Sequence, residues 1–108
     1  MDEITYEDFA RLDLRIGKIE AAERVEGTAK LVKLSVDLGT EKRTLVAGIA
    51  DSYGPESLPG KSIVVLANLK PRAIRGIESK GMLLAADVEG KAVLLTADRE
   101  APVGASVR

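Results

Sequence analysis

Four positively charged side chains lie close together in this chain, at Lys70, Arg72, Arg75 and Lys80. One acid, Glu78, accompanies them, although the whole chain has a net charge of −1. Clustered cations on a nearly neutral protein attract phosphate groups, and nucleic acids present phosphates at regular spacing. The cluster therefore predicts a site for a polyanion. The alternative is a charged loop that is merely solvated.

Three uncharged side chains in the same segment could contact parts of a nucleic acid other than its phosphates. Asn68, the only asparagine of the chain, and Ser79 could exchange hydrogen bonds with a ribose 2′-hydroxyl or a base edge. Met82 could give an apolar contact to an exposed base. Two alternatives stay open, because Asn68 could instead cap the backbone of its own loop and Met82 could pack in the core. Lys33 and Arg43 are possible further phosphate contacts from neighbouring strands.

The chain lacks the residue types on which most catalysis depends. It contains no cysteine and no histidine, which excludes thiolate nucleophiles, histidine bases and the usual zinc sites. The segment Gly60-Lys61-Ser62 lacks the upstream glycine of a phosphate-binding loop, because Pro55 occupies that position. We expect no enzyme activity, no catalytic residue, no cofactor and no metal ligand.

The small number of aromatic residues limits how RNA could be bound. Single-strand binders stack bases on aromatic side chains, and here only Tyr6, Phe9 and Tyr53 are available. Recognition of a folded backbone through phosphates is the expected mode instead. Such contacts position a nucleic acid without reading its sequence.

The elements that must position these residues are mostly strands. A capping Thr5 predicts a helix from Thr5 to Arg11, and Gly17 predicts a bulge or a bend in the strand that follows. Pro71, Gly76 and Gly81 predict that the basic segment is an irregular loop between strands. Strands are expected at residues 14–19, 32–38, 43–49, 62–67, 82–86 and 92–96.

Short strands of this number fit a small closed barrel with one core. We expect a single domain over residues 1–108, with an N-terminal helix segment at 1–12, the barrel at 13–96 and a C-terminal extension at 97–108. That extension either packs on its own barrel or helps to form a dimer. No apolar run could span a membrane, and Asp2 and Glu3 do not fit a secretory leader, so a cytoplasmic location is expected.

The order of residues in and around the basic segment resembles a known family. Asn68-Leu69-Lys70-Pro71-Arg72 followed by Gly76-Ile77-Glu78-Ser79-Lys80-Gly81-Met82 resembles the signature of the tRNA-binding domain family. The resemblance extends over residues 6–87 and includes Phe9 to Ile19, Val36 to Gly39 and Ala47-Gly48-Ile49. One departure is Val25-Glu26-Gly27, where many members carry a His-Pro pair.

The resemblance implies an all-β fold, a five-stranded OB-type barrel with a short N-terminal helix and a C-terminal extension. It implies a non-catalytic, structure-specific tRNA-binding protein that serves methionyl-tRNA synthetase as a trans-acting cofactor or beta subunit. Stand-alone members of the family are typically homodimers, so a homodimer that binds tRNA is expected here. The alternative is a chaperone-like or protein-interaction module without an RNA role, although relatives of that kind lack the paired motifs of this chain.

Overall fold

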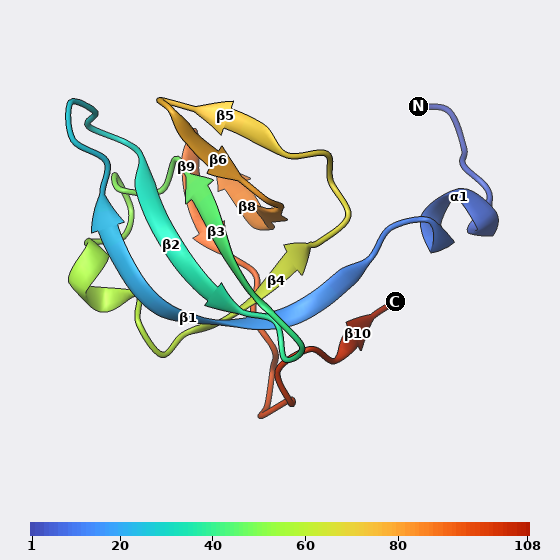
Figure 1. Ribbon diagram of the computed structural model, residues 1–108. Helices are drawn as coiled ribbons and strands as arrows, with labels where there is room; N and C mark the ends of the chain where they lie inside the picture. Colours follow the sequence, from blue (N-terminus) through green and yellow to red (C-terminus); the bar gives the residue numbers. More distant parts are fainter.

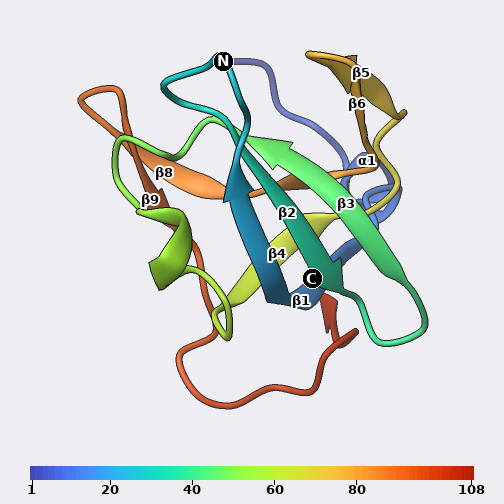
Figure 2. The same ribbon diagram turned by 60° about the vertical axis from the view of Figure 1, so that its left-hand side comes forward.

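A strongly curved antiparallel sheet wraps into a nearly closed barrel in this computed structural model, which describes residues 1–108 (Figure 1 and, turned by 60°, Figure 2). Its strands follow the order β3–β2–β1–β4–β7, and β10 pairs with the beginning of β1. The predicted five-stranded OB-type barrel with one short helix is confirmed. In chain order the elements are α1 (Tyr6–Ala10), β1 (Leu14–Arg24), β2 (Val32–Asp37), β3 (Lys42–Ala47), the 3₁₀ helix η1 (Pro55–Ser57), β4 (Ser62–Leu66), β5 (Arg72–Ile74), β6 (Ile77–Ser79), β7 (Met82–Leu83), β8 (Ala85–Val88), β9 (Lys91–Leu94) and β10 (Ser106–Val107).

Aliphatic side chains fill the barrel. In β2 they alternate strictly, with Val32, Leu34 and Val36 buried and the residues between them half exposed. The central strand β4 buries Ile63, Val64 and Val65 in succession. Complete burial of such a side chain stabilises the fold by about 1.5–3 kcal/mol, so these strands fix which face of each neighbour points inward.

Gly17 serves a close packing contact rather than the predicted bulge. A Cβ atom at Gly17 would lie 2.8 Å from Val36 Cγ1, so only glycine leaves room for the β2 side chains there. The irregularity in β1 comes later, where its register against β2 shifts between Ile19 and Ala21. Of the two alternatives predicted for Gly17, a bulge or a bend, the bulge was therefore wrong.

The basic segment is more ordered than an irregular loop. Strands β5 and β6 pair as an antiparallel hairpin in which Ile74 lies opposite Ile77. Arg75 and Gly76 form the two-residue turn, and both have positive φ, at 52° and 78°. These angles are those of a type I′ turn, whose twist suits a hairpin. The segment expected to be an irregular loop thus contains a paired hairpin, with Arg72 on β5 and Arg75 in its turn.

The two ends of the chain differ in how they meet the barrel. The C-terminal extension packs on its own barrel, because Val107 lies opposite Leu14 and Ile16 N donates to the Ala105 carbonyl at 2.9 Å. The helix α1 buries no residue and projects away from the sheet (Figure 1). Thr5 caps it as predicted, since Thr5 Oγ1 accepts from Asp8 N at 3.1 Å. None of the helices has the length and apolar character that crossing a membrane requires.

Candidate nucleic-acid interface

The hairpin β5–β6 stands on three polar supports, and the first is Arg43 on β3. Its Nη1 donates to the carbonyl oxygens of Ala67 and Lys80, the second at 3.2 Å. These two carbonyls lie at the two ends of the basic segment. One guanidinium therefore holds together the points where the segment leaves the barrel and returns to it. Arg43 Nε also donates to Glu41 Oε1 at 2.7 Å, which orients the guanidinium group.

Ser79 is the second support. Its side chain is buried, at 5 % exposure. Its Oγ accepts from Val46 N at 3.0 Å and donates to the Gly81 carbonyl at 3.1 Å. Both hydrogen-bonding functions of the hydroxyl are thus used inside the protein. The side chain fastens β6 to β3 rather than facing solvent.

Asn68 is the third support. Its Oδ1 accepts from Asp13 N at 2.9 Å and its Nδ2 donates to the Arg11 carbonyl at 2.7 Å. The side chain therefore caps backbone groups, but they belong to the segment before β1 rather than to its own loop. Sequence reasoning could not find these partners, which are more than fifty residues away.

Two ion pairs, Asp13–Arg15 and Glu41–Arg43, lie next to these supports. Asp13 binds the Arg15 guanidinium through two hydrogen bonds, at 3.0 and 2.7 Å. That hydrogen-bonded pairing lowers the pKa of Asp13 and raises the pKa of Arg15. The hydrogen bond from Arg43 likewise lowers the pKa of Glu41. Both carboxylates are therefore held charged.

The remaining predicted cations face solvent. Lys70, Arg72 and Arg75 are exposed and make no ion pair within the chain. Lys80 Nζ lies 3.6 Å from Glu78 Oε1, and both side chains are on the surface. Arg75 occupies the hairpin tip in a left-handed conformation that side chains rarely adopt. The basic segment, whose ends are anchored, thus carries three free positive charges, two of them on the hairpin and Lys70 just before it.

A hollow of about 220 Å³ lies between the end of β3 and this hairpin. Its lining includes four of the predicted residues, namely Lys70, Arg72, Ser79 and Met82. Met82 is 45 % exposed there, so the alternative that it packs in the core does not describe its position. The structure thus brings the two motifs of the basic segment together around one concave surface.

Lys33 lies apart from this hollow. It is half exposed on β2, where it pairs in register with Val46, and its Nζ is 3.7 Å from Glu23 Oε1. Of the predicted site residues, Asn68, Ser79 and Arg43 hold the hairpin in place. Lys70, Arg72, Arg75, Lys80 and Met82 are presented to solvent.

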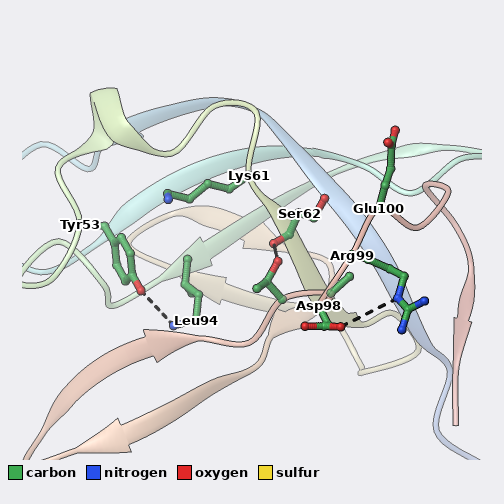
Figure 3. A pocket seen from close by; sticks show the side chains of 9 residues that line it. Tyr53, Lys61, Ser62, Leu94, Asp98, Arg99 and Glu100 are labelled. Atoms are coloured by element: carbon green, nitrogen blue, oxygen red, sulfur yellow. Dashed lines mark hydrogen bonds and ion pairs between the residues drawn. The ribbon is translucent and has the colours of Figure 1, made fainter.

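A larger hollow, of about 540 Å³, lies elsewhere (Figure 3). It is bordered by Tyr53, by the beginning of β4 and by the chain after β9, and Lys61 Nζ lies 5.9 Å from the Tyr53 ring centroid. Its lining has two acids, Asp98 and Glu100, and two cations, Lys61 and Arg99, so its charge is balanced. It offers polyanions no net attraction, unlike the hairpin. No three potential metal ligands cluster anywhere in the chain.

Comparison with known sequences bears on what this surface is for. Residues 14–106 match the sequence model of the family described as "Putative tRNA binding domain". The chain belongs to this tRNA-binding domain family. The match takes in the strands β1 to β9, including the basic hairpin, and ends at Ser106, the first residue of β10.

The same domain occurs within larger enzymes. The chain is 54 % identical over 106 residues to the methionine–tRNA ligase of Archaeoglobus fulgidus and 57 % identical over 104 residues to that of Thermotoga maritima. The alignments cover 98 % and 96 % of this chain but 16 % of either ligase. The tRNA-binding domain therefore spans about a sixth of the length of these curated relatives.

Solved structures include proteins of the same size. A MetRS-related protein from Pyrococcus horikoshii is 42 % identical, with a TM-score of 0.94 and complete coverage of both chains. The chaperone CsaA from Bacillus anthracis is 32 % identical, with a TM-score of 0.90, and the match covers 99 % of this chain and 100 % of that one. The barrel is thus shared by proteins described as synthetase-related and as chaperones.

Sequence reasoning missed part of the wall of the hollow near the hairpin. Leu69, Ile74 and Gly48 line it beside the predicted residues. A signal for Gly48 was present, because Ala47-Gly48-Ile49 and the basic segment both match the family pattern. Two matching segments far apart in the sequence are expected to meet in space when they serve one site.

Proposed function

We propose that this tRNA-binding domain is a non-catalytic protein that binds folded tRNA through the hairpin β5–β6, and that it serves methionyl-tRNA synthetase as a trans-acting cofactor or beta subunit. The observation that carries the proposal is the set of free cations Lys70, Arg72 and Arg75, which lie on a hairpin with anchored ends and just before it. An anchored backbone loses little conformational freedom when phosphates bind, which favours one RNA geometry over flexible strands.

The division of labour within the predicted site follows from the contacts. Lys70, Arg72, Arg75 and Lys80 would contact phosphates, with Lys33 as an outlying contact. Arg43, Ser79 and Asn68 would act indirectly, because their polar atoms already bind the protein backbone. Removing one of them should loosen the hairpin rather than delete an RNA contact.

Titration with three RNAs tests this function. The RNAs are folded tRNA, the same tRNA unfolded, and an unstructured RNA of equal length, measured by fluorescence anisotropy at several salt concentrations. We expect the folded tRNA to bind most tightly, with little dependence on its amino-acid identity. Equal or tighter binding of the unstructured RNA would contradict recognition of shape.

The chaperone alternative is supported by the likeness to CsaA. Its test is binding to an unfolded polypeptide, measured under the same conditions as tRNA. Affinity for the polypeptide without affinity for tRNA would favour the chaperone alternative over the RNA function.

A homodimer is part of the same proposal, and helix α1 supports it. Five-residue helices are unstable on their own, and α1 buries none of its residues in the single chain. Ile4 and Tyr6 are more than two-thirds exposed, and Leu12 is also exposed. A second copy would cover this apolar surface, together with the cleft between α1 and β10. Two hairpins on one particle would then bind one tRNA more tightly by avidity.

Sedimentation tests the dimer. The double variant Tyr6→Ser with Leu12→Ser should sediment as a monomer at micromolar concentration and bind tRNA more weakly. Val88→Ser with Val93→Ser is the matched control, because these valines are comparably exposed on the hairpin β8–β9. A wild-type protein that sediments as a monomer would contradict the proposal. Coelution with methionyl-tRNA synthetase on a sizing column tests that association separately.

A further inference from the structure

The hollow beside the hairpin β5–β6 is largely apolar. Exposed or half-exposed Leu69, Ile74 and Met82 line it, together with the buried side chains of Ile49 and Leu83. Apolar surface that stays open to water is unfavourable unless something covers it. Phosphate binding alone would not require such a surface, because phosphates interact with charges and polar groups.

Two free cations lie in the same lining. Lys70 and Arg72 are exposed and unpaired within the chain, and both border the hollow. An apolar concavity beside positive charge matches the two parts of a nucleotide, a flat ring and a negative phosphate. The polar hollow of Figure 3 lacks this combination, because acids balance its cations.

The backbone of the hollow adds polar groups of its own. Gly48 lies in the lining, and neither its N–H nor its carbonyl has a hydrogen-bond partner within the chain. A side chain at this position would have room, since the nearest atom to a Cβ is Leu31 Cδ2 at 3.9 Å. Because they have no partner within the chain, the Gly48 N–H can donate to the edge of a base and the Gly48 carbonyl can accept from it.

We propose that this hollow receives one unpaired base of the bound tRNA, while the phosphate next to that base lies against Lys70 and Arg72. The proposal rests on the tRNA-binding function above and adds to it a contact with a base. A volume of about 220 Å³ suits a single ring system, since it falls below the roughly 300 Å³ at which pockets for drug-sized ligands begin. Only an unpaired base can enter, because duplex RNA hides its bases in the stack.

The lining predicts how selective the contact is. It contains no aromatic ring, so the base meets methionine and aliphatic side chains instead of a stacking platform. The flexible thioether of Met82 adapts to different rings. We therefore expect the hollow to require an unpaired base without demanding a particular one.

A pair of variants separates this contact from phosphate binding. Met82→Ala should weaken tRNA binding about fivefold, on the order of 1 kcal/mol. It should leave the salt dependence unchanged, because no phosphate contact is lost. Leu95→Ala is the matched control, since Leu95 is 44 % exposed and Met82 is 45 % exposed. We expect the control to bind as the wild type. Ile74→Ala serves as a second hollow variant in case Met82→Ala is poorly folded by circular dichroism.

A fluorescent base locates the contact directly. Separate tRNAs carry 2-aminopurine at an unpaired position in the anticodon loop, the elbow loops or the 3′ end, and each is saturated with protein. We expect the fluorescence of one region to change with wild-type protein and to change less with Met82→Ala.

The outcomes separate the two proposals. If tRNA binds but Met82→Ala and Ile74→Ala keep wild-type affinity, or if no unpaired position responds, the base contact is wrong and the tRNA function stands. If wild-type protein does not bind tRNA, the function itself fails. If the two variants lose affinity for an unfolded polypeptide but keep it for tRNA, the hollow binds protein side chains instead.

Discussion

The hairpins β5–β6 and β8–β9 have the same turn geometry but carry side chains of opposite charge at their tips. Each closes with a two-residue turn in which both residues have positive φ, Arg75-Gly76 in the first and Glu89-Gly90 in the second. The first belongs to a segment with four cations and one acid, whereas the second carries Asp87, Glu89 and Lys91. Their turn geometry cannot explain a difference in function, so any difference must come from side chains and supports.

The supports of the two hairpins also differ. Arg43 and Ser79 fasten the first segment to β3, and Asn68 ties its beginning to the residues before β1. The second is held by the Tyr53 hydroxyl, which accepts from Leu94 N at 3.0 Å, and by Thr96, whose Oγ1 donates to the Ser62 carbonyl at 2.8 Å. A charged guanidinium that binds two carbonyls restrains a segment more strongly than either of these neutral hydrogen bonds. The hairpin with free cations is thus the one that has a charged support.

Of the changes that test this contrast, removal of the free cations should have the largest effect on tRNA binding. The triple variant Lys70→Ala, Arg72→Ala and Arg75→Ala should weaken tRNA binding by more than about tenfold and flatten the salt slope by roughly 2–3. Its thermal stability should change little, because exposed charges contribute little to folding. Titration of tRNA at several salt concentrations measures both quantities.

The control for the cations lies on the other hairpin. Lys91→Ala removes an exposed cation from β9 and should leave tRNA affinity and salt slope unchanged. Arg11→Ala tests the N-terminal segment in the same way. If the triple variant kept wild-type binding while either control lost it, the interface would lie on another face.

Loss of the supports should have the next largest effect. Arg43→Met leaves the carbonyls of Ala67 and Lys80 without their partner and should destabilise the fold by about 1–3 kcal/mol. It should also weaken tRNA binding severalfold, because the hairpin ends are no longer held together. Calorimetry gives the stability and anisotropy gives the affinity.

The second hairpin supplies the comparison for Arg43. Tyr53→Phe removes the hydroxyl that accepts from Leu94 N and should cost about 1 kcal/mol. We expect it to leave tRNA binding unchanged. Equal losses of affinity in Arg43→Met and Tyr53→Phe would show that general stability, not the position of the first hairpin, controls binding.

The two hairpins also show which features could be predicted from the sequence and which could not. Alternation in β2 and the apolar run of β4 were sufficient to predict those strands and their buried faces. The barrel followed from the number of short strands, and its OB type followed from the family resemblance. The free cations of the basic segment were found because charge clusters are visible in sequence. The hairpin itself was missed, since its turn places Arg75 where asparagine or glycine is usual, and no local signal marks such a residue.

The supports could not be predicted for a different reason. Ser79 was expected to face RNA, and Asn68 either to face RNA or to cap the backbone of its own loop. Their partners, Asp13 N before β1 and Val46 N on β3, lie more than thirty residues away in the sequence. Only the closed barrel brings these groups together. Polar residues in a binding segment can therefore be supports whose role depends on tertiary structure.

The turn residues themselves should have a smaller effect. Arg75→Asn and Glu89→Asn each place asparagine at a position with positive φ, where it is less strained. Both should stabilise the fold by about 0.5–1 kcal/mol. Only Arg75→Asn should weaken tRNA binding, about two- to threefold, because it alone removes a cation. Thermal melting and tRNA titration of the two variants give the comparison. Weaker binding of Glu89→Asn would place RNA on the second hairpin as well.

Acid should loosen the first hairpin before the second, and this is the smallest expected effect. The ion pairs with Arg15 and Arg43 lower the pKa of Asp13 and Glu41 in the folded state. A lowered pKa adds stability that is fully present above the unfolded pKa and is lost as the pH falls through the folded value, here below the ordinary carboxyl range. Protonation of Glu41 would free Arg43, and protonation of Asp13 would weaken the segment that Asn68 holds.

Amide chemical shifts followed by NMR measure this difference. Lys80 N, which donates to the Thr44 carbonyl at 2.9 Å, reports on the first hairpin, and Leu94 N reports on the second. We expect the Lys80 signal to shift at a higher pH than the Leu94 signal. Glu41→Gln should remove much of that difference, because its neutral amide cannot be protonated in this range. Simultaneous shifts of both amides in the wild type would mean that acid unfolds the barrel as a whole, and that the supports of the first hairpin have no separate sensitivity to pH.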